Sequence, residues 1–217
     1  DNLLTVTALA ARCPLMLAPA MDGGMFSHPA TQANLEILRQ RGCIIAGPAE
    51  GRMASGLVGL GRMVEPAELL GHIRLALGRG GPLSQQRVLV TAGGTQESID
   101  PVRSITNRSS GKQGYALAQA ALDAGAEVTL IHTPTNLPTP AGAQEVLVRT
   151  AAEMKEAVLV TAVACEVVLM AAAVADFRPA QVAEQKIKKG GGGLMLELEP
   201  TEDILMALAK ARRPSGL

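Results

Sequence analysis

Apolar and polar positions alternate along the second half of the chain in a pattern that predicts strands and helices in turn. Short apolar runs rich in Val, Leu and Ile predict buried strands, and apolar positions at helical spacing predict amphipathic helices. The expected order is strand 87–91, helix 112–124, strand 127–132, strand 145–148, helix 151–163 and strand 166–170. Such alternation is typical of a mostly parallel, doubly wound α/β sheet with right-handed crossovers.

The first part of the chain gives a weaker pattern of the same kind. Its predicted elements are a strand at 14–17, a helix at 31–41, a strand at 43–46 and a helix at 66–77. A stretch rich in glycine, proline and polar residues follows and predicts a linker. We therefore expect a domain at 1–78, a linker at 79–86 and a second domain at 87–217. A chain of 217 residues is long enough for two small domains.

Composition argues against nucleic acid and membrane as partners. Twenty basic residues balance twenty acidic ones and aromatic residues are only 1%, so no basic surface with stacking rings is expected. No apolar run reaches the roughly 18 residues of a membrane span, and no C-x-x-C spacing occurs. We expect a cytoplasmic protein with reduced cysteines at Cys13, Cys43 and Cys165.

Candidate chemistry gathers in the loop after strand 87–91. Gly93 and Gly94 allow a sharp turn and let the backbone approach a ligand without a Cβ in the way. Asp100, Arg103 and Asn107 follow, and they supply an acceptor, a fork of donors suited to carboxylate or phosphate, and an amide. Asp100 could equally be a residue that caps the loop. An anion-binding loop is one interpretation of this segment, and a solvated polar loop is the other.

Two further features favour the anion-binding interpretation. Ser109, Ser110 and Gly111 precede helix 112–124, where a serine cap would leave N–H groups facing an anion. The loops after Thr91 and Met170 both follow predicted parallel strands, where ligands bind in doubly wound sheets. Neither the dinucleotide fingerprint G-x-G-x-x-G nor the phosphate loop G-x-x-x-x-G-K-[ST] follows the strand.

Residues 91–112 read T-A-G-G-T-Q-E-S-I-D-P-V-R-S-I-T-N-R-S-S-G-K, and this run resembles the opening motif of phosphopantothenate-cysteine ligase. Two later segments, A-A-A-V-A-D-F-R-P at 171–179 and K-I-K-K at 186–189, are similar to that family's second nucleotide segment. Upstream, A-P-A-M-D-G-G-M-F at 18–26 and G-R-M-A-S-G-L-V-G-L-G-R-M at 51–63 resemble the flavin-dependent phosphopantothenoylcysteine decarboxylase.

In bacteria these two activities are commonly fused in this order, as a bifunctional enzyme of coenzyme A biosynthesis. The resemblance implies the C-terminal half of a flavodoxin-like or Rossmann-like flavoprotein domain, followed by a Rossmann-like doubly wound ligase domain. It also leads us to expect a fragment, lacking the start of the decarboxylase and the end of the ligase. The family forms homo-oligomers, with ligase dimers, decarboxylase trimers and a full-length dodecamer.

The resemblance to the ligase implies a reaction and assigns residues to it. The family activates the carboxylate of 4′-phosphopantothenate with CTP, releases pyrophosphate, and lets the amine of L-cysteine attack the acyl-cytidylate. Because the CTP triphosphate and the substrate carboxylate are both negatively charged, such a site needs Mg²⁺, lysines and oriented hydrogen-bond donors. The resemblance implies that the catalytic residues are Asn107, Arg103 and Lys186. It implies that the nucleotide is bound by Gly93, Gly94, Ala172, Ala173, Asp176, Lys186, Lys188 and Lys189, and that Asp176 also helps bind Mg²⁺. The implied substrate-binding residues are Asn107, Ser109, Ser110, Gly111 and Lys112.

The resemblance to the decarboxylase implies FMN and a site near Ala20, Met21, Asp22 and Ser55, where phosphopantothenoylcysteine would become 4′-phosphopantetheine. The chain departs from the pattern at two of these positions. Asp22 stands where the family has an amide, and a carboxylate there would repel the substrate carboxylate unless one is protonated. Ser55 replaces a cysteine, and a hydroxyl is a weaker acid than a thiol. The histidines do not match the catalytic one, and surface or strand-end places are expected for His28, His72 and His132.

Several alternatives remain open at this point. The chain could be an NAD(P)-binding Rossmann-type oxidoreductase, although that class ends its second strand with an acid, and here Glu127 opens the strand while His132 and Thr133 end it. It could also be a catalytically dead oligomerisation module. The lysines of K-I-K-K could form a solvated basic edge, and the glycine run 190–193 could be a loop over a nucleotide or a plain hairpin tip.

Overall fold

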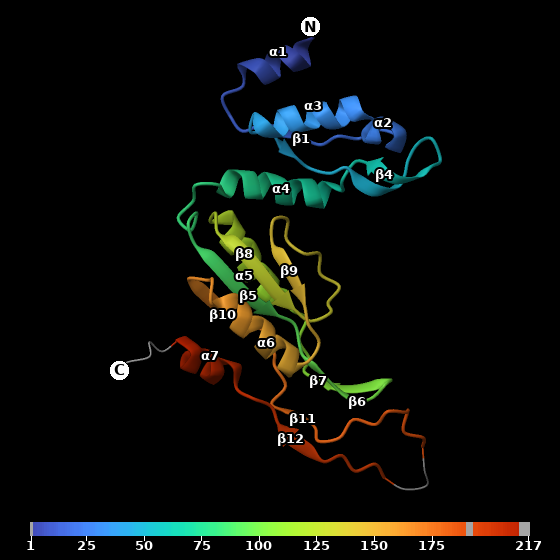
Figure 1. Cartoon of the computed structure of the whole chain (residues 1–217), viewed down its shortest axis with the longest axis vertical. Coiled ribbons are helices and arrows are strands. Elements are labelled where there is room, and N and C mark those ends of the chain that lie inside the picture. The colour runs from blue at the N-terminus through green and yellow to red at the C-terminus, as the bar shows by residue number, and fades with distance from the viewer. Residues whose placement is uncertain (1, 190–192, 213–217) are drawn as a thin grey trace. The chain divides into compact units, whose positions relative to one another are not determined.

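The computed structural model describes residues 2–189 and 193–212, and it divides into two compact units, Asp1–Leu77 and Gly78–Leu217 (Figure 1). The glycine run predicted to form a loop lies outside the described residues except for Gly193. Within the described residues, no helix is long and apolar enough to cross a membrane.

The first unit is a small α/β arrangement with few buried side chains. The strands β1 and β2 pair in parallel, and β3 and β4 form an antiparallel hairpin. The predicted elements are present with shorter strands, whereas α1, α2 and the hairpin were not predicted. The elements are α1 (Leu3–Ala10), β1 (Met16–Leu17), α2 (Gly23–Ser27), α3 (Pro29–Gln40), β2 (Ile44–Ile45), β3 (Ala49–Arg52), β4 (Val58–Arg62) and α4 (Pro66–Gly78), which runs one residue past the end of the unit.

The second unit is built on the parallel sheet that the sequence predicts. The strand order is β10-β5-β8-β9, and all three pairings are parallel. Two short antiparallel hairpins lie outside this sheet. The elements are β5 (Arg87–Ala92), β6 (Gln96–Asp100), β7 (Arg103–Thr106), α5 (Lys112–Asp123), β8 (Glu127–His132), β9 (Gln144–Leu147), α6 (Ala151–Ala162), β10 (Val167–Met170), β11 (Phe177–Pro179), β12 (Leu198–Pro200) and α7 (Ile204–Arg212).

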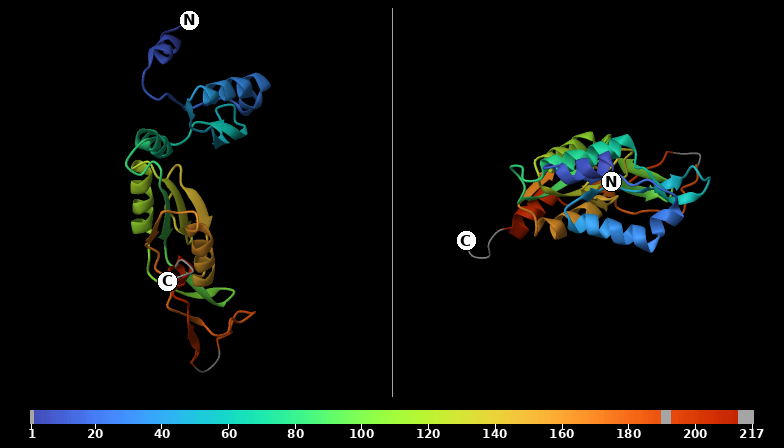
Figure 2. Two further views of the ribbon diagram at one scale, coloured as in Figure 1. Left: turned by 60° about the vertical axis from the view of Figure 1, so that its left-hand side comes forward. Right: turned by 90° about the horizontal axis from the view of Figure 1, so that it is seen from above.

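The direction of winding reverses beside β5. The chain passes from β5 through α5 to β8 and β9, and then returns through α6 to β10 on the other side of β5. Figure 2 shows α5 and α6 on opposite faces of the sheet. Leu89, Ile131, Met154 and Val158 are fully buried in the core between the sheet and α6. In such sheets ligands bind at the carboxyl ends of the strands where the winding reverses, here the ends of β5 and β10.

The segment 79–86, predicted as a linker, is a packed part of the second unit. Its backbone forms successive turns, and the Leu83 N–H donates to the carbonyl of Ala124 just after α5. A Cβ on Gly81 would lie 2.4 Å from the same carbonyl oxygen. The glycine and proline content of this segment therefore reflects tight turns against the sheet layer and not a free tether.

Candidate functional site

The loops after β5 and β10 are joined by backbone hydrogen bonds. The Ala173 N–H donates to the Gly93 carbonyl at 2.7 Å, and the Thr95 N–H donates back to the Ala173 carbonyl at 3.2 Å. The Thr91 hydroxyl accepts from the N–H groups of Ala171 and Ala172, at 3.1 Å each. The residues predicted to bind a nucleotide in the two loops, Gly93, Gly94, Ala172 and Ala173, are thus brought together.

Asn107 makes a third link between the same two loops. Its side-chain amide donates to the carbonyl oxygens of Ala173 at 3.3 Å and Val174 at 3.1 Å. The side chain lies on the exposed surface of this junction. The amide predicted to be catalytic therefore also fixes the loop that would carry the nucleotide.

The two glycines of the first loop are required by the protein itself. Gly93 has φ +87°, and a Cβ there would lie 2.1 Å from the Thr133 hydroxyl. A Cβ on Gly94 would lie 2.8 Å from the carbonyl oxygen of Asn107. Neighbouring segments fill the space beside each Cα, so the fold itself requires both glycines, and approach of a ligand to their backbone stays a prediction.

The predicted serine cap of α5 is wrong. The residue before the helix, Gly111, has φ +73°, and no side chain caps the helix there. Only glycine adopts this left-handed conformation without strain, so the cap position excludes serine. The Ser110 hydroxyl accepts from the Lys112 N–H at 3.5 Å, the limit of a hydrogen bond, and a Cβ on Gly111 would lie 3.4 Å from the Gly93 N. The predicted substrate residues from Ser109 to Lys112 therefore adjoin the Gly93 loop.

Arg103, predicted as catalytic, is engaged by the protein. Its guanidinium donates to the Asp100 carboxylate through Nε and Nη2, and Nη2 also donates to the carbonyl of Ile187 at 2.9 Å. Asp100 is 2% exposed, and the Arg103 guanidinium holds the pKa of its carboxyl well below the ordinary range. The acceptor predicted for a ligand is therefore saturated by protein donors.

The predicted lysines lie at an open basic cavity of about 860 Å³. Lys186, Lys188 and Lys189 are exposed, and they line it together with Arg103 and Ile187. Across residues 2–189 and 193–212, these three lysines form no ion pair with a carboxylate. Unpaired cations around a hollow of this size are suited to a polyanion such as a triphosphate.

The predicted ligase residues thus form two groups at opposite ends of one hairpin. Asp100 pairs with Arg103 at the turn between β6 and β7, beside the lysines, whereas Gln96 pairs with Thr106 at the other end, next to Asn107. The hairpin itself was predicted as an irregular loop. Four residues of strand separate the groups by roughly 13 Å at ~3.3 Å per residue.

Asp176 lies apart from the lysines. With Glu202 and Asp203 it lines a cavity of about 320 Å³, and its carbonyl accepts from the Thr201 N–H at 2.9 Å. Among the described residues, no group of three or more His, Cys, Asp or Glu side chains is arranged to hold a metal ion. The role of Asp176 toward Mg²⁺ therefore stays a prediction.

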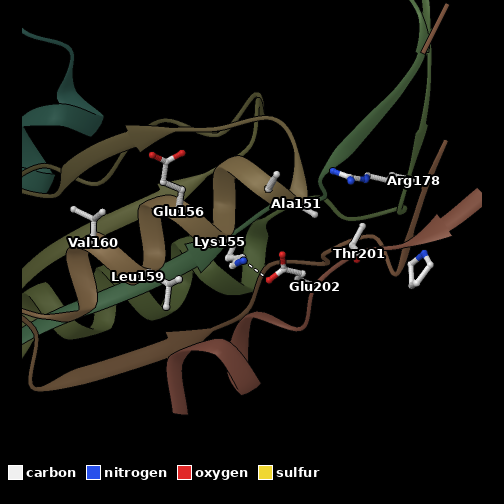
Figure 3. Close-up of a pocket in the computed structure, with 10 residues that line it drawn as sticks. Ala151, Lys155, Glu156, Leu159, Val160, Arg178, Thr201 and Glu202 are labelled. Carbon is white, nitrogen blue, oxygen red and sulfur yellow. Dashed lines mark hydrogen bonds and ion pairs between the residues drawn. The ribbon is translucent and has the colours of Figure 1, made fainter. Parts of the chain in front are cut away.

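A further cavity, of about 460 Å³, lies between α6 and β12 (Figure 3). Lys155 is ion-paired with Glu202, and Arg178 is paired with Glu199 at 2.7 Å. Because both cations already have carboxylate partners, this cavity is a poorer site for a polyanion than the one lined by the lysines of K-I-K-K.

In the first unit, the two residues that depart from the decarboxylase pattern touch each other. The Ser55 hydroxyl donates to Asp22 Oδ2 at 2.6 Å, and the Gly24 N–H at the start of α2 donates to Oδ1 at 3.1 Å. The bond from Ser55, and then that from Gly24, lower the pKa of the Asp22 carboxyl. The neighbouring Met21 N–H donates to the Gly61 carbonyl, and Ala20 is exposed. Asp22 is thus stabilised as a carboxylate.

His132 lies at the end of β8, one of the two places expected for it, and it is buried there at 5% exposure. Its Nε2 contacts Glu145 at 2.6 Å and its Nδ1 contacts the Tyr115 hydroxyl at 3.1 Å. The only sequence signal was a polar residue that ends an apolar strand. His28 instead caps α3, accepting from the Ala30 N–H.

Comparison with known families assigns the whole chain. The family model described as "DNA/pantothenate metabolism flavoprotein C-terminal domain" matches residues 83–217, and the model described as "Flavoprotein" matches residues 1–77. The chain belongs to the DNA/pantothenate metabolism flavoprotein family. An α/β flavoprotein fold is accordingly confirmed as the fold class.

Curated relatives agree with this assignment. The coenzyme A biosynthesis bifunctional protein CoaBC is 46% identical over 216 residues in Bacillus subtilis (98% of this chain, 53% of the relative) and 49% identical over 219 residues in Mycobacterium tuberculosis H37Rv (98% and 52%). A "Cysteine/Cysteine sulfinic acid decarboxylase" from an unknown prokaryotic organism is 47% identical over 222 residues (100% and 62%). The chain spans about half to three fifths of these relatives.

Two solved structures resemble part of the chain. The C-terminal domain of the bifunctional protein CoaBC is 44% identical, with a TM-score of 0.53 over 60% of this chain and 61% of that one. The DNA/pantothenate metabolism flavoprotein from Streptococcus pneumoniae is 26% identical, with a TM-score of 0.52 over 58% and 65%.

Proposed function

We propose that this chain carries parts of two consecutive enzymes of coenzyme A biosynthesis. Residues 87–217 would belong to a CTP-dependent phosphopantothenate-cysteine ligase, and residues 1–78 to an FMN-dependent phosphopantothenoylcysteine decarboxylase, with 79–86 between them. The proposal includes a cytoplasmic location, which rests on the reduced cysteines expected from the sequence, and homo-oligomeric assembly, which rests on the family resemblance.

The observation that carries the ligase proposal is the junction of the two motif loops. Gly93, Asn107 and Ala173 come from segments up to 80 residues apart, and hydrogen bonds hold them together where the winding of the sheet reverses. The basic cavity at the other end of the β6–β7 hairpin supplies cations for a triphosphate. A nucleoside triphosphate is an extended ligand that could occupy both places.

In this proposal the chain's residues neutralise and orient the reactants. Lys186, Lys188 and Lys189 would offset the charge of the CTP triphosphate, and Asp176 would help hold Mg²⁺. The phosphopantothenate carboxylate would attack the α-phosphorus as pyrophosphate leaves, and the cysteine amine would then attack the acyl carbon as CMP leaves. Asn107, with the segment Ser109–Lys112, would position the pantothenate end.

The decarboxylase half is supported by the contact between Asp22 and Ser55. Both come from motifs that resemble the decarboxylase, and they present a carboxylate and a hydroxyl at one place in the first unit. These groups fit the substrate end of a flavin site, and FMN would supply the redox chemistry. Asp22 is stabilised as a carboxylate. The carboxyl group of a substrate bound beside it would therefore be protonated, or would contact the Ser55 hydroxyl in place of Asp22.

The test is calorimetric titration of the whole chain with CTP, ATP and NADPH in magnesium buffer, with Lys186→Ala as control. We expect CTP to bind more tightly than ATP and the Lys186→Ala variant to bind CTP more weakly. Binding of NADPH alone would favour an oxidoreductase. Assembly without binding of any nucleotide would favour the oligomerisation module.

A further inference from the structure

Asp100 is an acid buried at the edge of the basic cavity. It lies at the turn between β6 and β7, and its side chain is 0% exposed, although Arg103 beside it lines the cavity. A buried carboxylate is costly unless donors surround it. Its partners therefore indicate why the chain places it there.

Three backbone N–H groups and one guanidinium satisfy this carboxylate. Oδ1 accepts from the N–H groups of Val102 and Arg103, each at 2.9 Å, which fixes the turn. Oδ2 accepts from the Arg103 guanidinium and from the Ile187 N–H at 3.1 Å. The low pKa of the Asp100 carboxyl agrees with this set of donors, which favour its charged form.

The hydrogen bond from the Ile187 N–H to Asp100 joins the turn to a segment far along the chain, and Arg103 binds the carbonyl of the same residue. Arg103 Nη2 donates to the Ile187 carbonyl at 2.9 Å, so both backbone groups of Ile187 are held from the hairpin turn. A further tether lies four residues earlier, where the Ala183 N–H donates to the Ile99 carbonyl. Ile187 lies between Lys186 and Lys188, so the hydrogen bonds to its backbone fix the positions of the Cα atoms of both lysines.

We propose that Asp100 and Arg103 are positioning residues that clamp the Ile187 backbone and thereby present Lys186 and Lys188 to a polyphosphate. This inference rests on the proposed ligase site and deepens it, because it gives Asp100 a role and gives Arg103 one other than direct contact with reactants. Arg suits the role because its planar fork bonds a carboxylate and a carbonyl at once, which Lys cannot do.

The clamp and a purely electrostatic effect predict opposite changes in the affinity for a polyanion when Asp100 is replaced by Asn. Asp100→Asn removes a negative charge beside four cations, so a field effect alone would tighten the binding of a polyanion. The clamp predicts weaker binding, because the amide of Asn turns a donor toward the donors that Asp100 now accepts from. The lysines would then have to be ordered on binding. The direction of the change therefore separates the two.

The first measurement is calorimetric titration of the whole chain with inorganic tripolyphosphate, followed by CTP. We expect Asp100→Asn to weaken tripolyphosphate binding by roughly tenfold, the effect of ordering one or two long side chains. Arg103→Lys keeps the charge and should also weaken it. The matched control is Glu184→Gln, which removes the same charge from an exposed position two residues before Lys186 and should leave binding unchanged or tighten it.

The second measurement is hydrogen exchange at the Ile187 amide. The clamp predicts that this amide is protected from exchange, whereas direct contact of Arg103 with the reactants would not require such protection. Exchange should accelerate in Asp100→Asn and stay slow in Lys186→Ala. Fluorescence of Tyr115, the single tyrosine in a chain without tryptophan, checks that each variant is folded.

The clamp is overturned if Asp100→Asn binds tripolyphosphate as tightly as the parent, or if its Ile187 amide stays protected. It is also overturned if the folded parent does not bind tripolyphosphate. If tripolyphosphate binds through Lys186 and the clamp, but CTP binds no more tightly than tripolyphosphate, the clamp stands and the CTP-dependent function fails.

Discussion

Gly93 shows how one residue can be fixed by two independent constraints. Its φ of +87° disfavours any residue with a Cβ, and a Cβ would also lie 2.1 Å from the Thr133 hydroxyl at the end of β8. The left-handed conformation alone costs about 1–2 kcal/mol for a residue other than glycine. The contact with Thr133 adds to this, because Thr133 is itself buried and cannot move away freely.

We expect Gly93→Ala to lower the free energy of unfolding by more than about 2 kcal/mol. The control is Gly80→Ala, since Gly80 has a similar φ of +78° but nothing within 4 Å of the Cβ position. That variant should lose only about 1–2 kcal/mol. Denaturant unfolding followed by Tyr115 fluorescence measures both, and equal losses would mean that the Thr133 contact is relieved by a small shift.

Residue types in the motif loops were predictable from the sequence, but their partners were not. The sequence indicated that Arg103, Asn107 and Lys186 belong to one site. It could not show that Arg103 also donates to the Ile187 carbonyl, because Ile187 lies 84 residues further along the chain. The burial of His132 at its expected strand end was not predictable for a similar reason, since it depends on Tyr115 and Glu145 from other elements.

At the scale of elements, the predictions succeeded where a strand is buried on both faces. The strands β5 and β8 are buried along most of their length, and the helix α5 between them has an apolar stripe, so the predicted bounds of all three came within a residue or two. The β6–β7 hairpin was missed because its strands are short and polar. Its pairing is stabilised by contacts with other segments, such as the Glu97 carboxylate that accepts from the Ala151 N–H at 2.8 Å.

Arg87 and Glu166 connect the start of β5 with the residue before β10. The Glu166 carboxylate accepts from the Arg87 guanidinium at 2.6 Å and from its backbone N–H at 2.7 Å. These bonds lower the pKa of the Glu166 carboxyl from an ordinary 4.5 to about 2. A carboxyl with a lowered folded pKa contributes stability above the ordinary value, and that contribution is lost as pH falls from 4.5 toward 2.

We therefore expect Glu166→Gln to be less stable than the parent at neutral pH, with the difference shrinking through this acidic window. Both groups are partly exposed, so solvent screening keeps the effect small. Unfolding by denaturant at a series of pH values, again read by Tyr115 fluorescence, gives the difference. Glu156→Gln on the outer side of α6 serves as control, and a difference that is independent of pH would show that the ion pair does not titrate as described.

At the scale of the whole molecule, the two candidate sites lie in separate compact units. Asp22 and Ser55 are in Asp1–Leu77, and the residues from Gly93 to Lys189 are in Gly78–Leu217. The sequence predicted two α/β parts from the change in pattern near residue 78, and the family resemblance ordered them. It could not predict that segment 79–86 belongs to the second unit, because its glycine and proline content is typical of a linker. The hydrogen bond from the Leu83 N–H to the Ala124 carbonyl joins this segment to that unit.

Separate units lead us to expect separable sites, which a pair of substitutions can test. Ser55→Ala should leave the dissociation constant for CTP unchanged, because its partner Asp22 lies in the first unit. Lys186→Ala should weaken CTP binding, and the double variant should match it, as expected for sites that share no partners. Calorimetric titration of the three variants measures this. A double variant that binds CTP more weakly than Lys186→Ala would mean that the decarboxylase-like residues are energetically coupled to the nucleotide site.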